Sequence, residues 1–138
     1  EHVILPEKGL VLPGDVVIVN INPLEREEIP TTPQQIRNRV NEISFNSSLL
    51  RELRAINFVQ RLLADGTMKP GRMKAVRVHM IADDDLMTQL SVRTKLIPVP
   101  QILARLKQAG RDAAATFLER DGHNIGQQSS VDLPAMFS

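Results

Sequence analysis

The sequence predicts an α/β fold in which one long helix connects two parallel strands. Residues 16–19 are four aliphatic residues in a row, which is typical of a strand covered on both faces of a parallel sheet. Residues 33–64 have helical apolar spacing, and residues 75–81 alternate as a second strand. Strand, long helix and strand form a βαβ unit, whose crossover is expected to be right-handed. We therefore expect a fragment of a mostly parallel sheet, with strands near 16–21 and 75–81, a crossover helix over 33–64 and C-terminal helices.

The helix over 33–64 is predicted from signals at both of its ends. Thr32 stands at the N-cap, Pro33 takes the first helical position, and Gln35 completes a capping box. Gly66 is expected to end the helix in the left-handed conformation. At 1.5 Å per residue the helix is roughly 45–50 Å long, enough to cross one face of a domain.

The apolar pattern of this helix changes along its length. Ile36, Val40 and Ile43 predict a narrow buried stripe in the first half. From Phe45 onward the apolar set widens, so we expect the second half to be buried on more than one side. Between the halves, residues 46–48 are weak helix formers, which fit either a tolerated kink or a polar patch facing a cleft. The wider set consists of Leu49, Leu50, Leu53, Ile56, Val59, Leu62 and Leu63.

The other elements are predicted more briefly. Residues 1–15 fit a loop or short hairpin. In the second strand, Val76, Val78 and Met80 are expected to be buried while Arg77 and His79 face water, which places this strand at or near a sheet edge. Asp83–Asp85 are expected to begin a short helix that runs to Leu90. A further helix is expected over 101–120, with its apolar stripe at Ile102, Leu106, Ala109, Ala113 and Phe117.

Composition limits the classes of function. The 138 residues amount to one domain or part of a larger one, and 17 basic against 16 acidic residues give no whole-chain field that would recruit nucleic acid or anionic lipid. The absence of cysteine excludes disulfides and zinc fingers. Aromatic residues make up only 3%, which argues against base stacking. No apolar run reaches the roughly 20 residues of a transmembrane helix, so no transmembrane segment is expected.

The sequence contains few candidates for chemistry. It has no Gly-x-Ser-x-Gly, no phosphate-binding glycine loop and no His-Glu-x-x-His. His79 near Asp83–Asp85 is a conceivable metal ligand, but these aspartates are better explained as helix-start residues. The arginines of the long helix alternate with Glu42 and Glu52 as on a solvated face, with phosphate binding as the alternative. We therefore expect no catalytic, cofactor-binding or metal residue and no cofactor. Those arginines are Arg37, Arg39, Arg51, Arg54 and Arg61.

One long segment resembles a known family. The run GDVVIVNINPLEREEIPTTPQQIRNRVNEISFNSSLLRELRAINFVQRLL, residues 14–63, resembles the C-terminal part of bacterial patatin-like phospholipases. In that family a strand ending in Ile-Asn-Pro leads to a long helix containing NEISFNSSL, here Asn41–Leu49. Residues 76–81, 91–96 and 129–137 are similar to later family segments. The resemblance covers about residues 15–137.

The resemblance implies a lipid acyl hydrolase with a Ser-Asp dyad. The family's Gly-x-Ser-x-Gly serine, its Asp-Gly-Gly or Asp-Gly-Ala aspartate and its oxyanion loop all lie N-terminal to the matched region. The pairs Asp65-Gly66 and Asp121-Gly122 lack the third small residue, so neither is assigned a catalytic role. Residues 1–14 do not match the family segment that brings the aspartate to this strand. We therefore expect this chain alone to be inactive and to serve as a scaffold region.

The resemblance also sets the expected partners. These are the missing N-terminal catalytic segment, in the same or a cleaved chain, or a second copy, together with the lipid substrate of the parent protein. Nucleic acid is not an expected partner. The expected location is the cytoplasm or the membrane periphery. The alternative function is a non-enzymatic interaction module that docks a partner through the leucine-rich half of the long helix.

Overall fold

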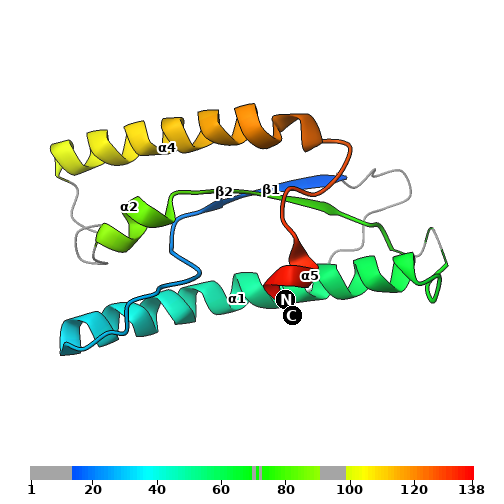
Figure 1. Ribbon diagram of the computed structural model, residues 1–138, viewed down its shortest axis with the longest axis horizontal. Helices are drawn as coiled ribbons and strands as arrows, with labels where there is room; N and C mark the ends of the chain where they lie inside the picture. The colour runs from blue at the N-terminus through cyan, green and yellow to red at the C-terminus, as the bar shows by residue number, and fades with distance from the viewer. Residues whose placement is uncertain (1–13, 70, 72, 91–98) are drawn as a thin grey trace, which may run out of the picture.

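The computed structural model describes residues 14–69, 71, 73–90 and 99–138. Its sheet has two parallel strands, β1 (Asp15–Asn20) and β2 (Arg77–Ala82), paired from Asp15 opposite Arg77 to Asn20 opposite Ala82. The predicted βαβ unit is confirmed. A larger, mostly parallel sheet is not seen among the described residues. Figure 1 shows three layers, with α1 (Pro33–Ala64) on one face of the sheet and α4 (Pro100–Asp121) on the other.

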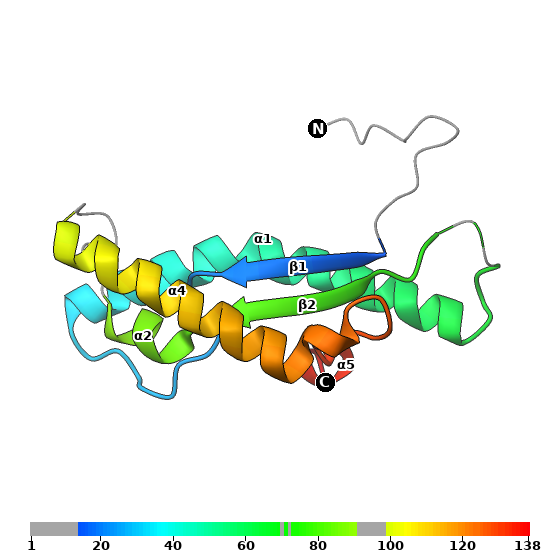
Figure 2. The same ribbon diagram turned by 90° about the horizontal axis from the view of Figure 1, so that it is seen from above.

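The crossover between the strands is right-handed. Figure 2 shows β1 and β2 pointing the same way, with the connecting helix α1 on the far side of the sheet from the viewer. This is the expected hand for a parallel connection. Helix α1 has the predicted bounds and the predicted cap. The Thr32 Oγ1 atom accepts from the Gln35 amide at 3.3 Å, and Gln35 Oε1 accepts from the Thr32 amide at 3.0 Å. Gly66 follows the helix with φ of +70°.

The buried stripe of α1 differs from the predicted one. Ile36, Val40 and Ile43 are exposed, so the predicted narrow apolar stripe is wrong for this half of the helix. Glu42 and Asn46 are buried instead, because distant groups bond them: Arg26 forms an ion pair with Glu42, and Asn46 Nδ2 donates to the Pro23 carbonyl at 2.9 Å. The helix runs through residues 46–48 without interruption.

The hydrophobic core lies between the second half of α1, the sheet and the C-terminal segment. Leu53, Val78 and Leu133 are almost fully buried there. Ile18 and Met80 of the strands and Leu49 and Ile56 of α1 pack around them, followed by residues near α5 (Leu133–Met136). The leucine-rich half of α1 therefore faces the sheet as well as solvent.

The remaining elements largely follow the sequence. The short helix α2 (Asp84–Gln89) has Asp83 as its N-cap, with Oδ1 accepting from the Leu86 amide at 3.0 Å. In α4 the predicted stripe from Ile102 to Phe117 is buried or half-buried. β2 begins two residues later than predicted, where the Val76 carbonyl accepts from Gln60 Nε2 instead of continuing the ladder. A 3-10 turn, η1, covers Gly122–Asn124. The expectations for 1–13 and 91–96 lie outside the described residues.

The two edges of the sheet differ in whether a further segment of the described chain is hydrogen-bonded to them. The Val78 carbonyl accepts from the amides of Ser130 and Val131, and the Val78 amide donates to Ser129 Oγ, so the C-terminal segment closes the β2 edge. On β1, Val19 is 67% exposed, which corrects the expectation of a strand covered on both faces. The physical reason is that, among the described residues, β1 is paired along a single edge, with β2. None of the helices in the described part of the chain has both the length and the hydropathy that a bilayer crossing requires.

Candidate functional site

A polar cluster joins both strands to the C-terminal segment on the α4 side of the sheet. Asp15 and Arg77 are opposite each other in the register, and alternation along β2 places His79 on the same face. The guanidinium of Arg77 donates two bonds to the Asp15 carboxylate, each 2.8 Å long. The Gly126 amide donates to Asp15 Oδ1 at 2.9 Å. These bonds, those from Arg77 first, hold the pKa of Asp15 well below its usual range.

His79 is fully buried, so the prediction that it faces water is wrong. Its Nε2 atom lies 3.1 Å from Asp15 Oδ1, and its Nδ1 atom lies 2.8 Å from Ser130 Oγ. The ring also packs edge-on against Phe117 of α4, with 6.1 Å between the centroids. Burial is possible because both ring nitrogens have partners. The aspartates that follow it in sequence, Asp83–Asp85, are not those partners.

The two partners of the His79 ring differ in the hydrogen bonds that they can form. The ionised Asp15 carboxylate can only accept, so His79 Nε2 is the donor to it, whereas Nδ1 is paired with the Ser130 hydroxyl, which can donate or accept. Ser130, His79 and Asp15 therefore form a chain in the order found in serine hydrolases, with the two ring nitrogens exchanged. Ser130 is only partly buried and lines a pocket.

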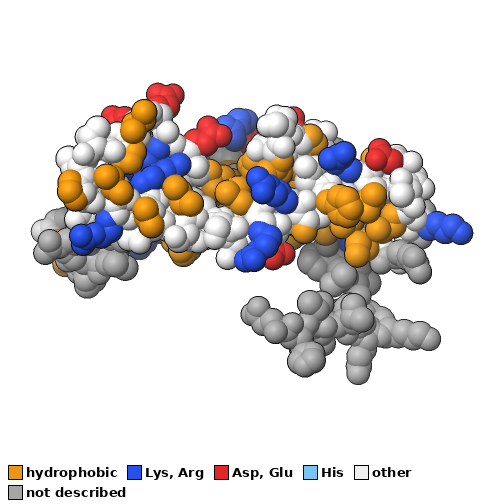
Figure 3. Space-filling view, turned by 90° about the horizontal axis from the view of Figure 1, so that it is seen from below, with side chains coloured by type: hydrophobic (Ala, Val, Ile, Leu, Met, Phe, Trp, Pro, Cys, Tyr) orange, Lys and Arg blue, Asp and Glu red, His pale blue; other side chains and the backbone are white. Residues whose placement is uncertain are grey.

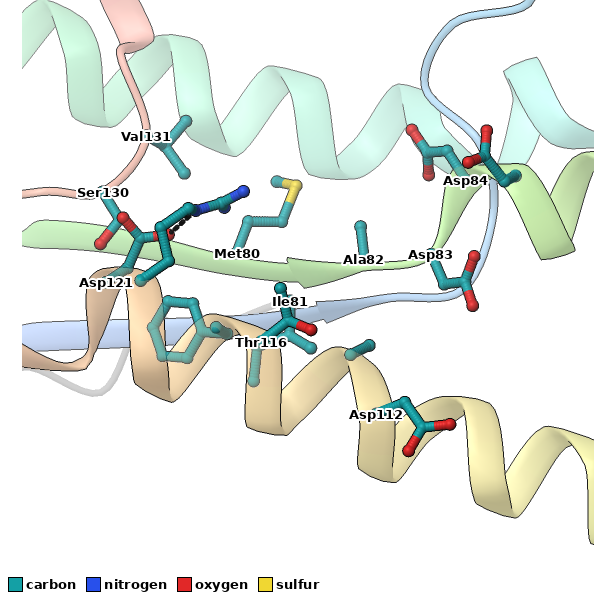
Figure 4. Close-up of a pocket in the computed structure, with 14 residues that line it drawn as sticks. Met80, Ile81, Ala82, Asp83, Asp84, Asp112, Thr116, Asp121, Ser130 and Val131 are labelled. Atoms are coloured by element: carbon teal, nitrogen blue, oxygen red, sulfur yellow. Dashed lines mark hydrogen bonds and ion pairs between the residues drawn. The ribbon is translucent and has the colours of Figure 1, made fainter.

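That pocket, of about 690 Å³, lies between β2, α2 and α4. Figure 4 shows Asp83 and Asp84 at one end, at the carboxyl end of β2, Asp112 and Thr116 on α4, and Ser130 and Asp121 at the other end. Burial, then the charges of Asp85 and Asp83, raise the pKa of Asp84. In the described part of the chain, no three side chains of His, Cys, Asp or Glu come together as metal ligands. The predicted alternative of a His79 metal site therefore has no support from the geometry.

In the described part of the chain, the backbone amides beside Ser130 are already engaged in hydrogen bonds. An exposed serine must be accompanied by donors directed at the developing oxyanion. The amides of Ser130 and Val131 both donate to the Val78 carbonyl, and the pocket carries aspartates around it. The negative charges of these aspartates would repel a developing oxyanion rather than stabilise it. The chain of Ser130, His79 and Asp15 thus fastens the C-terminal segment to the sheet, and we assign it a structural role.

The cluster was not predicted, although part of its signal is in the sequence. Arg77 and His79 are polar residues two positions apart in the second predicted strand, so they share one face of it. The register of the two strands places Asp15 opposite Arg77, on that same face. Ser130 lies 51 positions after His79, and no local pattern connects them.

The arginines expected on a solvated face of α1 are indeed mostly exposed. Neither Asp-Gly pair belongs to the cluster: Asp65 caps α1, and Asp121 ends α4.

Three comparisons bear on the origin of the chain. No protein-family model, no curated protein and no solved structure matched it. What the chain does must therefore be argued from its own geometry and from the resemblance described above.

Proposed function

We propose that this chain is the C-terminal scaffold region of a patatin-like serine acyl hydrolase. The parent protein would hydrolyse ester bonds of phospholipids or related acyl lipids through an acyl-enzyme, with its Ser-Asp dyad outside these residues. In this proposal β1 is an inner strand of a larger, mostly parallel sheet, α1 covers one face of that sheet, and the chain contributes no catalytic residue.

The edge of β1 opposite β2, which pairs with no strand in the described part of the chain, is the observation that carries the proposal. The Arg77 amide donates to the Gly14 carbonyl at 2.8 Å, so alternate residues from Gly14 onward direct their backbone polar groups to β2. Val17 and Val19 consequently direct theirs away from β2, in the orientation that accepts another strand. A strand of aliphatic residues with an open edge is a template for pairing.

The side chains of β1 support the same conclusion. Val17, Val19 and Ile21 are exposed although they are aliphatic. Beside them an apolar pocket of about 310 Å³ lies between the carboxyl end of β1 and α4, lined mainly by Val19, Ile21, Ile81, Leu106 and Ala113. Filling a pocket of this kind and covering the three side chains are favourable at about 25 cal/mol per Å² of apolar surface. A neighbouring strand and its connection would do both.

The alternative function is an interaction module without enzymatic activity. A docking surface on the leucine-rich half of α1, as the sequence suggested, has weaker support, because Leu49, Leu53 and Ile56 pack in the core of this chain. The exposed apolar residues on the other side of α1 are the observation in its favour. The two functions differ in what must lie upstream of residue 1.

The experiment begins with the gene. We expect the coding sequence upstream of residue 1 to encode a Gly-x-Ser-x-Gly and an Asp-Gly-Gly or Asp-Gly-Ala element. The intact product should hydrolyse a short-chain p-nitrophenyl ester and a phospholipid, and Ser→Ala at the elbow should abolish both activities. The 138 residues alone should show no turnover. An intact product without these elements, or with unchanged turnover after the serine substitution, would refute the proposal.

A further inference from the structure

A second surface, on the outer side of α1, is unlike the rest of the helix. Its members follow one another at intervals of three, four or eleven residues, so they share one face of the helix. We call this set the outer stripe. It consists of Ile36, Val40, Ile43, Arg54, Phe58 and Arg61. Its apolar members are 48%, 54%, 55% and 59% exposed in that order, which is unusual for large hydrophobic side chains at regular spacing.

The missing part of the sheet would not cover this stripe. Arg54 lies over the ring of Phe137, with its Cζ atom 5.1 Å from the ring centroid. Phe137 follows α5, in the C-terminal segment that closes the β2 edge. The stripe therefore faces outward and toward the β2 side, whereas new strands would be added at the β1 edge. Figure 3 shows the α1 side of the molecule, where hydrophobic side chains gather in groups with Lys and Arg side chains between them.

The stripe carries two arginines, Arg54 and Arg61, and helix α1 itself places no carboxylate on that face. Helix α1 has two carboxylates, and Glu42 is buried in its ion pair with Arg26. Glu52 precedes Arg54 by two residues, which places it on nearly the opposite side of the helix. Asp65 lies at the helix end. Exposed aliphatic and phenyl groups beside arginines match the interface of an anionic bilayer, where apolar groups enter the headgroup boundary and cations meet lipid phosphates.

We propose that the outer stripe of α1 is a membrane-surface site that docks on anionic lipid. Nucleic acid fits less well, because Ile36, Val40 and Ile43 offer no stacking platform for bases. The near-zero net charge of the whole chain does not oppose the site, since the relevant field is local and extends over about one Debye length. The inference rests on α1 alone and holds whether or not the parent is a hydrolase.

Vesicle binding of the full 138-residue chain tests this inference. The chain should co-sediment with vesicles of equal parts phosphatidylcholine and phosphatidylglycerol, much less with pure phosphatidylcholine, and less in high salt. Ile43→Ser with Phe58→Ser should weaken binding about tenfold, because each loses apolar contact with the bilayer. Arg54→Gln with Arg61→Gln should weaken it as well. The matched control is Leu103→Ser with Leu118→Ser on α4, whose side chains are also exposed, and it should bind like the parent.

A fluorescence measurement makes the test independent of variant stability. The chain has no tryptophan, so Phe58→Trp introduces a single reporter on the stripe. Its emission should move to shorter wavelength when anionic vesicles are added, while Leu118→Trp should not respond.

Equal binding to neutral and anionic vesicles, or stripe variants that bind like the parent, would overturn the site. So would stripe-dependent binding to single-stranded RNA without lipid, or stripe variants that only convert a dimer to a monomer. No readout involves hydrolysis, so failure here is separate from failure of the proposed function.

Discussion

Asp15 connects β1 to two other parts of the molecule. Its carboxylate accepts from Arg77, the Gly126 amide and His79, which belong to β2 and to the loop after α4. These donors stabilise the ionised form, so the pKa of Asp15 lies well below that of an unfolded aspartate, about 3.9. A lowered pKa contributes stability above the unfolded pKa, and that contribution is lost as pH falls toward the folded one.

The expected result is a pH-dependent difference between the parent and Asp15→Asn. Urea unfolding at a series of pH values should show the parent more stable near neutral pH, with the difference shrinking as pH falls below about 4. Asp84→Asn is the control of opposite sign, because burial raises the pKa of Asp84. That variant should gain stability near neutral pH and lose its advantage in acid. A difference for Asp15→Asn that stays constant from pH 6 to about pH 2 would show that its ion pair does not contribute.

At the scale of elements, short sequence signals correctly predicted where α1 and β1 lie in the chain, because these positions depend on neighbouring residues. The capping box at Thr32 and Gln35 set the start of α1, and the aliphatic run from Val16 placed β1. Burial within those elements was harder to predict, because it depends on partners far away in the chain. The burial of His79 depends on hydrogen bonds with Asp15 and Ser130, which are 64 and 51 positions away. The burial of Glu42 depends on Arg26, which is 16 positions away. A polar residue with such partners can take the place that periodicity gives to an apolar one.

We expect the Arg26–Glu42 ion pair to stabilise the packing of the segment between β1 and α1 against helix α1. Arg26 donates to both carboxylate oxygens, at 2.6 and 2.7 Å, and the Glu42 side chain is buried. Arg26→Met should therefore lower the free energy of unfolding by about 3 kcal/mol, because it removes the two shortest bonds to a buried carboxylate. The measurement is urea denaturation, and the exposed Arg37→Met is the control, expected to change stability by less than about 0.5 kcal/mol.

The double variant Arg26→Met with Glu42→Leu separates the two contributions. Removing both charges also removes the uncompensated carboxylate, so the double variant should be more stable than Arg26→Met alone. If the two changes are simply additive, Glu42 does not depend on Arg26, and its burial must be satisfied by other groups.

At the scale of the whole molecule, the two sheet edges differ in a way that sets how the chain behaves in isolation. The β2 edge is closed by Ser129 and the two residues after it, whereas β1 directs the polar groups of Val17 and Val19 outward. Each aliphatic side chain that moves from water to a packed interface contributes about 1.5–3 kcal/mol. Val17 and Val19 of β1, with Ile21 directly after it, account for a strong tendency to pair with another strand.

We therefore expect the isolated 138 residues to self-associate through β1. Light scattering coupled to size exclusion should give a mass that rises with protein concentration, and Val19→Lys should reduce that rise, because a charge on an open edge opposes strand pairing. Ile29→Lys is the matched control, since Ile29 is exposed in the connection before α1, away from the edge. A parent chain that remains a compact, cooperatively melting monomer at all concentrations would contradict the open edge as a pairing site. It would also remove the main support for a missing neighbouring strand, because the exposed valines would then be tolerated without one.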